Sequence, residues 1–480
     1  MKNMQELRAS LVVFLVALPL CLGIALASQA PLAAGIFAGI IGGIVVGFLS
    51  GSEISVSGPA AGLTVIVATA ITQLGSFELF CLAVMLAGLM QVAFGLVRAG
   101  DLGQFFPSSV IKGMLTAIGL ILIMKQAPML IGWRAGSYTA GVALVGILSL
   151  LLLLGWEKIL TPRFAWARLI PGALIAVLGS IAMNAWVLKG TALEIQAQSL
   201  VSLPFDGSWG GFWGSLHLPD WHGFAMGGIW KTALTLAIVA SLETILSLDA
   251  ADKMDPLGRV SNKNRELLAQ GAGNTLCGLV GALPVTAVIV RTTANVSAGA
   301  QYRLSAIVHG VWLLLCAMFI PNLLNLIPLT TLAAVLLLVG FKLCRPGLFV
   351  EQFKLGKVHF TLFIVTIGAI LVTDLLIGIA VGLVLGIVLT AKKYRRKVIF
   401  VQSTGASTQV EFRGHATFLH KLTLARTLSE LPREKSITIV SSEEWEFHPD
   451  IEAMLQDFKN SSSQRNIRVT LSHRGRTIRA

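Results

Sequence analysis

The sequence predicts a polytopic α-helical membrane protein with about fourteen membrane-spanning helices, followed by a small cytoplasmic α/β domain. Two observations predict this class. Of the 480 residues, 55% are hydrophobic and only 13% are charged, and the mean hydropathy is +0.79. Apolar runs of roughly 17 to 25 residues recur from position 11 to position 390, and each is long enough to cross a ~30 Å hydrocarbon core as a helix. A soluble fold could not bury so much apolar surface.

The apolar runs define the expected spans, whose ends are known to about two to four residues. The spans are 9–28, 31–50, 58–74, 77–97, 108–131, 138–155, 169–188, 229–252, 264–281, 284–298, 303–322, 327–341, 358–375 and 377–392. The first span follows two basic residues as a signal peptide would, but its apolar run leads directly into a second span. It is therefore interpreted as a retained membrane helix.

The basic residues account for a net charge of +13, and their distribution predicts the orientation of the chain. They gather in alternate connections between the spans, which places both termini in the cytoplasm and favours an even number of spans. The expected location is the inner (plasma) membrane. Because the charge marks the cytoplasmic side, it is not read as a nucleic-acid-binding surface. The long, Trp-containing connection 189–228 is then an outer loop.

A change in composition near position 393 predicts two domains. The transporter domain is expected to cover residues 1–393, with repeats of about 1–190 and 229–393. A basic cluster at 392–397 ends the last span and would contact an anionic inner leaflet. The remaining residues, 394–480, alternate short β-like and helical runs, which is typical of a small α/β domain.

Two short segments differ from the other apolar runs, because each carries a proline after small residues. They are Ser57–Thr64 and Ala282–Val288, and they stand third in each set of seven spans. With Pro59 and Pro284 at the first helical position, each is expected to be a half-helix that begins inside the membrane. Matching half-helices indicate an inverted repeat, and their unpaired N–H groups and helix dipoles together favour an anion. The alternative is that the prolines only kink ordinary helices.

Glu243 is interpreted as the one carboxylate deep within a long apolar span. A charge there costs roughly 2.5 to 3.5 kcal/mol on insertion scales, so it usually has a function. Ser247 lies one helical turn further on, and the pair is expected to hold a coupling proton or Na⁺ ion. The alternative is a protonated Glu243 that serves helix packing. Arg291 either supplies positive potential to an anion pathway or snorkels toward the cytoplasm.

No set of residues in the sequence predicts an enzyme. The five cysteines are scattered, the eight histidines are dispersed, and no Ser/His/Asp set, metal-ligand spacing or phosphate-binding loop is visible. No cofactor is expected other than a coupling Na⁺ or H⁺, and no metal other than that Na⁺.

At these segments the sequence resembles the SulP family of inorganic anion transporters, over nearly the whole chain. The resemblance rests on Ser57-Gly58-Pro59, Ala240-Ser241-Leu242-Glu243, Gln270, Gly271, Asn274, Gly278, Gly281, Pro284, Thr286, Arg291, Asn295 and Gly299. It implies core and gate subdomains, elevator-like alternating access, a C-terminal STAS domain and a homodimer. Two residues depart from the family pattern: Ala287 stands where glycine is frequent, and Val290 where serine is frequent.

The resemblance also implies where the substrate and the coupling ion bind. The residues expected at the anion are Cys21, Ser57, Gly58, Ala60, Ala61, Val285, Thr286, Ala287 and Arg291. Glu243 matches the acidic position that binds or relays the coupling cation. The leading hypothesis is thus a Na⁺- or H⁺-coupled transporter of sulfate or bicarbonate. The alternatives are an uncoupled anion channel or exchanger, and a dicarboxylate or nucleobase carrier of the same fold.

Overall fold

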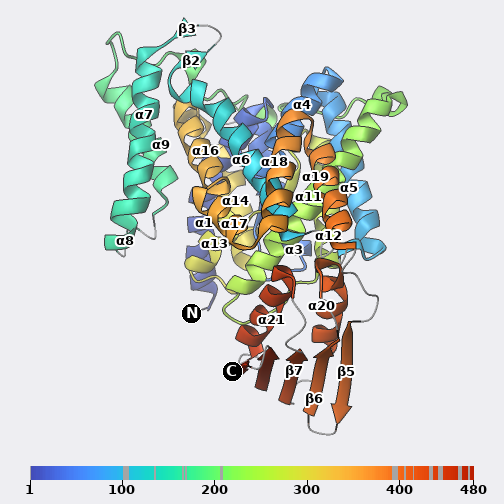
Figure 1. Cartoon of the computed structure of the whole chain (residues 1–480). Helices are drawn as coiled ribbons and strands as arrows, with labels where there is room; N and C mark the ends of the chain where they lie inside the picture. Colours follow the sequence, from blue (N-terminus) through green and yellow to red (C-terminus); the bar gives the residue numbers. More distant parts are fainter. Residues whose placement is uncertain are drawn as a thin grey trace. The chain divides into compact units, whose positions relative to one another are not determined.

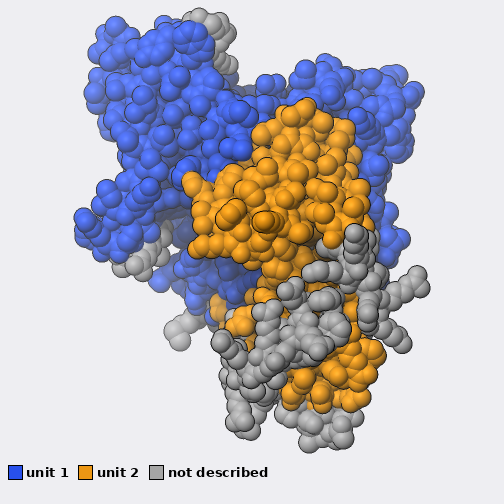
Figure 2. Space-filling model, viewed as in Figure 1, with its two compact units in different colours: residues 1–100, 118–255, 260–344 blue, residues 101–117, 256–259, 345–480 orange. Residues whose placement is uncertain are grey.

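The computed structural model describes all of the chain except twelve short internal segments and the two terminal residues, 1 and 480. These segments are 101–106, 135–136, 165–166, 168–169, 206–208, 392–397, 405–406, 414–415, 432–435, 442–446, 463–467 and 474–475. The chain forms two compact units, coloured in Figure 2. Unit 1 comprises residues 1–100, 118–255 and 260–344, and unit 2 comprises 101–117, 256–259 and 345–480. The boundary predicted at 393/394 is a different division and stays a prediction.

Unit 1 is built almost entirely from helices (Figure 1). In chain order they are α1 (Lys2–Ala27), α2 (Leu32–Ile41), η1 (Gly42–Val46), α3 (Gly47–Leu49), η2 (Ala61–Leu63), α4 (Thr64–Leu74), α5 (Phe77–Leu96), most of α6 (Ser108–Leu130), α7 (Ala140–Gly155), η4 (Trp156–Leu160), α8 (Thr161–Arg163), α9 (Gly172–Ala182), η6 (Met183–Val187), η7 (Ala197–Ser199), α10 (Trp209–Gly214), η8 (Trp221–Ala225), α11 (Gly227–Met254), α12 (Lys263–Val280), α13 (Ile289–Ser297), α14 (Leu304–Phe319), α15 (Pro321–Leu324) and α16 (Leu329–Leu343). A short hairpin, β2 (Trp133–Arg134) and β3 (Ser137–Tyr138), follows α6.

The predicted apolar spans coincide with helices. Among the described residues, seven helices are long and apolar enough to cross a membrane, and five shorter apolar helices accompany them. Each expected span contains at least part of one of the helices in the two units. The helical membrane class is therefore confirmed, whereas the exact number of spans stays a prediction.

The segments expected to start the two half-helices are instead paired strands. β1 (Ser57–Pro59) runs antiparallel to β4 (Val285–Ala287), with Gly58 opposite Thr286. The helices begin later, at η2 after β1 and at Ile289 after β4. The prediction that the prolines occupy the first helical position is thus wrong. The physical reason is that the two segments satisfy their buried backbone groups by pairing with each other, which a reading of either segment alone does not reveal.

Helices α5 and α12 approach each other closely enough that their backbones touch. A Cβ atom added at Gly271 would lie 2.6 Å from the backbone nitrogen of Val92, and one added at Gly88 would lie 2.6 Å from the carbonyl oxygen of Gly271. Small residues permit such contact between membrane helices, where packing rather than the hydrophobic effect drives association. Within this pair, α12 carries the side chains that hydrogen-bond both β1 and β4.

Aromatic side chains of the connection 189–228, which is expected to be an outer loop, pack against α2. Phe205 and Phe212 pack edge-on against Phe37 of α2, with ring centroids 5.8 and 5.4 Å away. The side chains of Trp213 and Trp221 are about half exposed, which suits the interfacial role expected for aromatics in this loop. These ring contacts hold the described part of the connection against α2.

Unit 2 contains the last apolar helices and a five-stranded sheet. Its helices are α17 (Pro346–Lys354), α18 (Lys357–Val372), α19 (Leu375–Ala391), η9 (Phe418–His420), α20 (Lys421–Glu430) and α21 (Pro449–Ser462); its strands are β5 (Ile399–Thr404), β6 (Ser407–Phe412), β7 (Ser436–Ser441), β8 (Arg468–His473) and β9 (Arg476–Arg479). The strands follow each other in chain order across the sheet, antiparallel at both edges and parallel in the centre. These elements lie where the sequence pattern predicts an α/β tail.

A buried polar cluster surrounds the start of α21 within unit 2. Asp450 accepts hydrogen bonds from the backbone N–H of Ser108, at 3.1 Å, and from its hydroxyl group. The Lys421 ammonium lies 3.6 Å from the same carboxylate. Together with His448 and Ser108, Lys421 holds the pKa of Asp450 below its usual range, against the opposing effect of burial. The cluster joins the first turn of α6 to the tail.

His448 makes the stability of unit 2 dependent on pH. Its ring packs on that of His359, with centroids 4.5 Å apart, and burial lowers its pKa from 6.5 to about 4. Since the unfolded chain binds this proton at higher pH than the folded one, stability falls as pH drops below about 6.5, by up to roughly 3 kcal/mol near pH 4. We expect the melting temperature in detergent to fall over this interval, and to fall less in His448→Gln.

The matched control is His222→Gln, because the His222 side chain is almost fully exposed. That variant should keep the pH dependence of the unmodified protein. An identical slope in His448→Gln and His222→Gln would contradict the assignment.

Candidate functional site

Arg291 is the largest fully buried side chain in the described part of unit 1, and it lies at the β1–β4 ladder. It is the third residue of α13, and its side chain is completely shielded from solvent. Its Nη2 atom donates a hydrogen bond to the Cys21 sulfur at 3.1 Å. Nε and Nη1 have no hydrogen-bond partner among the described residues. The alternative that Arg291 snorkels to the cytoplasm is therefore wrong.

Small residues make room for the guanidinium group. A Cβ atom at Gly58 would overlap Nη1 of Arg291, so β1 approaches the group directly. A Cβ atom at Gly39 of α2 would lie 2.7 Å from the Cys21 sulfur and 3.9 Å from Nη1. Helices α1, α2 and α13 and strand β1 thus meet at one point. An arginine is expensive to bury without a counter-charge, so unpaired donors here favour an anion.

Polar side chains fix the two strands in place. The Gln270 amide donates to the Ser57 hydroxyl at 2.7 Å, and the Asn274 amide pairs with the backbone N–H of Val285 at 2.6 Å and its carbonyl at 3.0 Å. The Ala287 N–H donates to the Thr244 hydroxyl at 3.3 Å. These bonds explain in physical terms why amide residues occupy these two places on α12. The N–H groups of Val285 and Ala287 are consequently used within the protein.

Glu243 lies beside the start of the first half-helix. A Cβ atom at Gly62 would lie 2.6 Å from Oε2 and 2.7 Å from Oε1, and the Gly62 N–H hydrogen-bonds the carboxylate. Oε2 is buried and has no hydrogen-bond partner among the described residues. Ser247, one turn further along α11, is buried as well. A carboxylate at the N-terminus of a short helix can hold a proton or a monovalent cation.

Two buried groups were missed by the sequence reading. Glu266 is completely buried at the start of α12, where it accepts hydrogen bonds from Ser50 at 2.5 Å and the Gly51 N–H at 2.8 Å. Glu266 lies in the first turn of α12 rather than deep within a span, so it adds a second buried carboxylate to Glu243 without changing the prediction for Glu243. Glu266 follows a basic residue in the sequence, which is typical of an exposed loop end.

His309 is the second missed group. It is fully buried on α14, and its Nδ1 atom pairs with the Ala306 carbonyl. Its Nε2 atom has no hydrogen-bond partner within the described ranges, and its Cε1 atom would be 2.7 Å from a Cβ atom at Gly43. A single histidine in an apolar run carries no sequence signal that separates a functional group from a packing one.

The structure thus brings most of the predicted residues to one region. Cys21, Gly58 and Arg291 are in direct contact, and Ser57 and the residues of β4 adjoin them through the ladder. Ala60 and Ala61 lead from β1 toward Gly62, where Glu243 lies. No group of three or more potential metal-ligating residues occurs in the described ranges.

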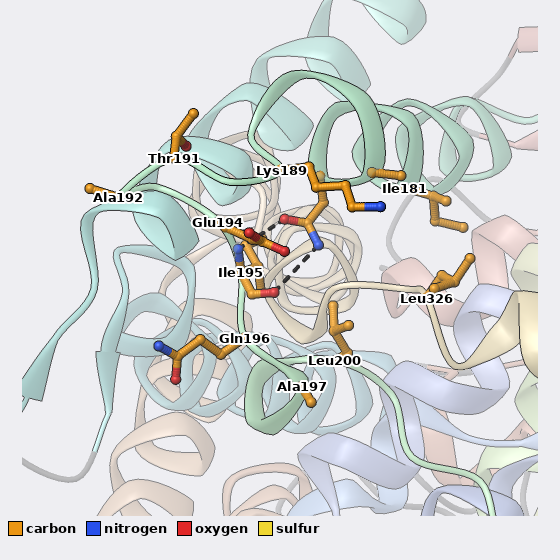
Figure 3. A pocket seen from close by; sticks show the side chains of 12 residues that line it. Ile181, Lys189, Thr191, Ala192, Glu194, Ile195, Gln196, Ala197, Leu200 and Leu326 are labelled. Atoms are coloured by element: carbon orange, nitrogen blue, oxygen red, sulfur yellow. Dashed lines mark hydrogen bonds between the residues drawn. The ribbon is translucent and has the colours of Figure 1, made fainter.

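A surface cavity in unit 1 lies elsewhere (Figure 3). It has a volume of about 530 Å³ and is lined by residues from α9, η6 and the connection 189–228, including Lys189, Glu194 and Gln196, and by Leu326. Its wall is held by the Asn184 amide, which pairs with both backbone groups of Ile195. None of the predicted site residues lines this cavity, so it is not assigned to the anion.

Comparison with known proteins decides the family. The model of the sulfate permease family matches residues 4–366, which is most of the chain. The chain belongs to the sulfate permease family. It is therefore a multi-pass membrane protein of an anion-transporter family, as the resemblance implies.

Individual relatives and solved structures agree with this assignment. The chain is 28% identical to "Putative sulfate transporter YvdB" of Bacillus subtilis, covering 81% of this chain and 73% of that one. It is 25% identical to the bicarbonate transporter BicA of Synechocystis, and the match covers 81% of this chain and 70% of that one. The transmembrane domain of a cyanobacterial BicA has a similar fold, with a TM-score of 0.67 at 22% identity, over 80% of this chain and 98% of that one. The structure of the murine solute carrier 26 family member A9 anion transporter in the inward-facing state has a TM-score of 0.70 at 14% identity. The match covers 98% of this chain and 85% of that one.

Proposed function

We propose that this protein is a secondary active transporter of sulfate or bicarbonate, driven by Na⁺ or H⁺ through Glu243. The observation that carries the proposal is the fully buried Arg291 guanidinium, whose Nε and Nη1 atoms lack partners among the described residues. A small oxyanion is the ligand that satisfies such donors and cancels the buried charge. The names of the relatives, which specify sulfate and bicarbonate, support these two substrates.

The proposed anion site differs in one respect from a pair of opposed helix N-termini. The N–H groups of Val285 and Ala287 are not free for an anion, because they donate to the side chains of Asn274 and Thr244. Arg291, in the first turn of α13, then supplies the positive charge, and the α13 dipole adds to it. The anion is held near Cys21 and Gly58.

Coupling is proposed to arise from the position of Glu243. Its carboxylate lies at the start of the first half-helix, and the next residue along α11, Thr244, bonds β4. A proton or Na⁺ at Glu243 neutralises a buried negative charge and so favours anion binding nearby.

We propose elevator-like movement of a core that contains both sites. We also propose a homodimer, an inner-membrane location with cytoplasmic termini, and a STAS-like tail.

The test is uptake of labelled sulfate and, separately, bicarbonate into proteoliposomes with imposed Na⁺ or H⁺ gradients. Uptake of one anion should follow one cation gradient in the unmodified protein. In Glu243→Gln the response to the gradient should disappear, because the amide cannot exchange a proton or neutralise a cation. Gradient-insensitive uptake by the unmodified protein would favour the channel or exchanger, and failure of both anions to enter would direct attention to dicarboxylates and nucleobases.

A further inference from the structure

A relay of buried polar side chains links helix α11, which carries Glu243, to strand β4. The Ser241 hydroxyl accepts a hydrogen bond from Gln91 Nε2 at 3.2 Å. Gln91 Oε1 in turn accepts one from Asn274 Nδ2 at 2.6 Å. Asn274 ends the relay at both backbone groups of Val285. The relay therefore crosses from α11 through α5 and α12 to the strand.

All three side chains of the relay are buried, and each of its two amides is hydrogen-bonded through both its nitrogen and its oxygen. Gln91 is completely shielded, Asn274 is 1% exposed and Ser241 is 6% exposed. Each amide donates through its nitrogen and accepts through its oxygen, so neither can rotate without losing a bond. At positions shielded from solvent, such bonds hold one geometry, because a broken bond leaves a polar group unpaired.

The two ends of the relay flank the two proposed binding sites. Ser241 precedes Glu243 by two residues, and Thr244, which follows Glu243, bonds the N–H of Ala287. Four residues beyond Ala287 stands Arg291. Helix α11 is thus joined to β4 at two points, one through the relay and one directly. Any displacement of α11 would therefore act on β4, the strand that lies four residues before Arg291.

We infer that Gln91 and Asn274 are positioning residues that make the affinity for the anion depend on the cation bound at Glu243. This inference rests on the proposed function. It assigns these two amides a role distinct from binding, because their hydrogen bonds go to Ser241, to each other and to Val285. Their task is to keep β4 in register with α11, so that the two sites change together.

The variant that tests the inference with the least disturbance is Ser241→Ala, which removes only the first bond of the relay. Anion uptake is measured against anion concentration, with and without the cation gradient. In the unmodified protein, the cation should lower the KM for the anion. The KM ratio is the KM without the cation gradient divided by the KM with it. In Ser241→Ala this ratio should fall by about threefold or more, toward one, while the maximal rate changes by less than about twofold. Ser241→Thr, which keeps the hydroxyl group, should restore the ratio.

The matched control is Ser149→Ala. Ser149 is also a buried serine that bonds a hydroxyl group, that of Thr331 at 3.2 Å, but it lies on α7 outside the relay. It should keep the KM ratio of the unmodified protein. A second variant, Gln91→Met, keeps a side chain of similar length but removes both the donor to Ser241 and the amide acceptor for Asn274, and should reduce the ratio in the same way.

A second readout does not require transport. The rise in melting temperature that saturating anion produces in detergent is measured with and without the cation, for the same variants. An unchanged cation effect in both Ser241→Ala and Gln91→Met would overturn the inference. A loss of rate and melting temperature with an unchanged KM ratio would also overturn it. Anion uptake and anion stabilisation that no cation alters in the unmodified protein would contradict the proposed coupling, and the inference with it.

Discussion

Replacing Arg291 with glutamine is expected to reduce anion uptake by at least about 100-fold, which corresponds to roughly 2.7 kcal/mol. The side chain is completely buried, and two of its nitrogen atoms have no partner within the described residues, so its charge is available to the substrate. Glutamine retains one donor group but no charge. Uptake into proteoliposomes at equal protein content measures the effect, with melting temperature in detergent as the measure of folding.

Removal of a buried, uncompensated charge should not unfold the protein. Without substrate, the Arg291 guanidinium is a cost to stability, so Arg291→Gln should melt at the same temperature or higher. Arg265→Gln is the matched control, because the Arg265 Nε atom donates to the Leu49 carbonyl from an exposed position. Uptake by Arg291→Gln at the level of Arg265→Gln would remove Arg291 from the anion site.

Replacing Gly58 with alanine is expected to raise the KM for the anion by about tenfold or more, with little change in stability. The added Cβ atom would overlap Arg291 Nη1, which is the mobile end of a long side chain. The guanidinium group can therefore move aside at small cost, but it then leaves the place where the anion is bound. Uptake measured over a range of anion concentrations separates this loss of affinity from a loss of rate.

The control for Gly58→Ala is Gly179→Ala on α9. There the nearest atom to an added Cβ is 3.8 Å away, an ordinary van der Waals contact. That variant should keep the KM of the unmodified protein and gain slightly in helix stability. If Gly58→Ala transported the anion with unchanged KM, the guanidinium group would not be the determinant of the binding site.

The membrane class and the family were predictable because they depend on local properties of the sequence. The length and composition of each apolar run are sufficient to indicate a helix in a membrane, and the helices lie at the expected runs. The positions of Glu243 and Arg291 could be singled out because charged residues are rare in such runs. Ser57 and Val285 were singled out because each lies close to a proline, Pro59 or Pro284, that was expected to start a helix. In the structure both residues belong to strands.

What the sequence could not show are contacts between distant parts of the chain. The β1–β4 ladder joins segments more than 200 positions apart, and neither segment alone indicates that it is paired. Likewise, the partners of the buried Glu266 carboxylate are Ser50 and Gly51, which follow α3 more than 200 positions earlier in the chain. The sequence reading also left open whether Arg291 points inward, and only its contact with Cys21 decides the question.

The central claim is that a small inorganic anion binds beside Arg291, between β1 and the first turn of α13. The most direct measurement is an experimental structure of the full chain with saturating sulfate, and another with saturating bicarbonate. The account predicts density for one of these anions within hydrogen-bonding distance of Arg291 Nη1, and near Gly58 and Cys21. Density for a transported anion at another place, with the Arg291 guanidinium unoccupied, would contradict it.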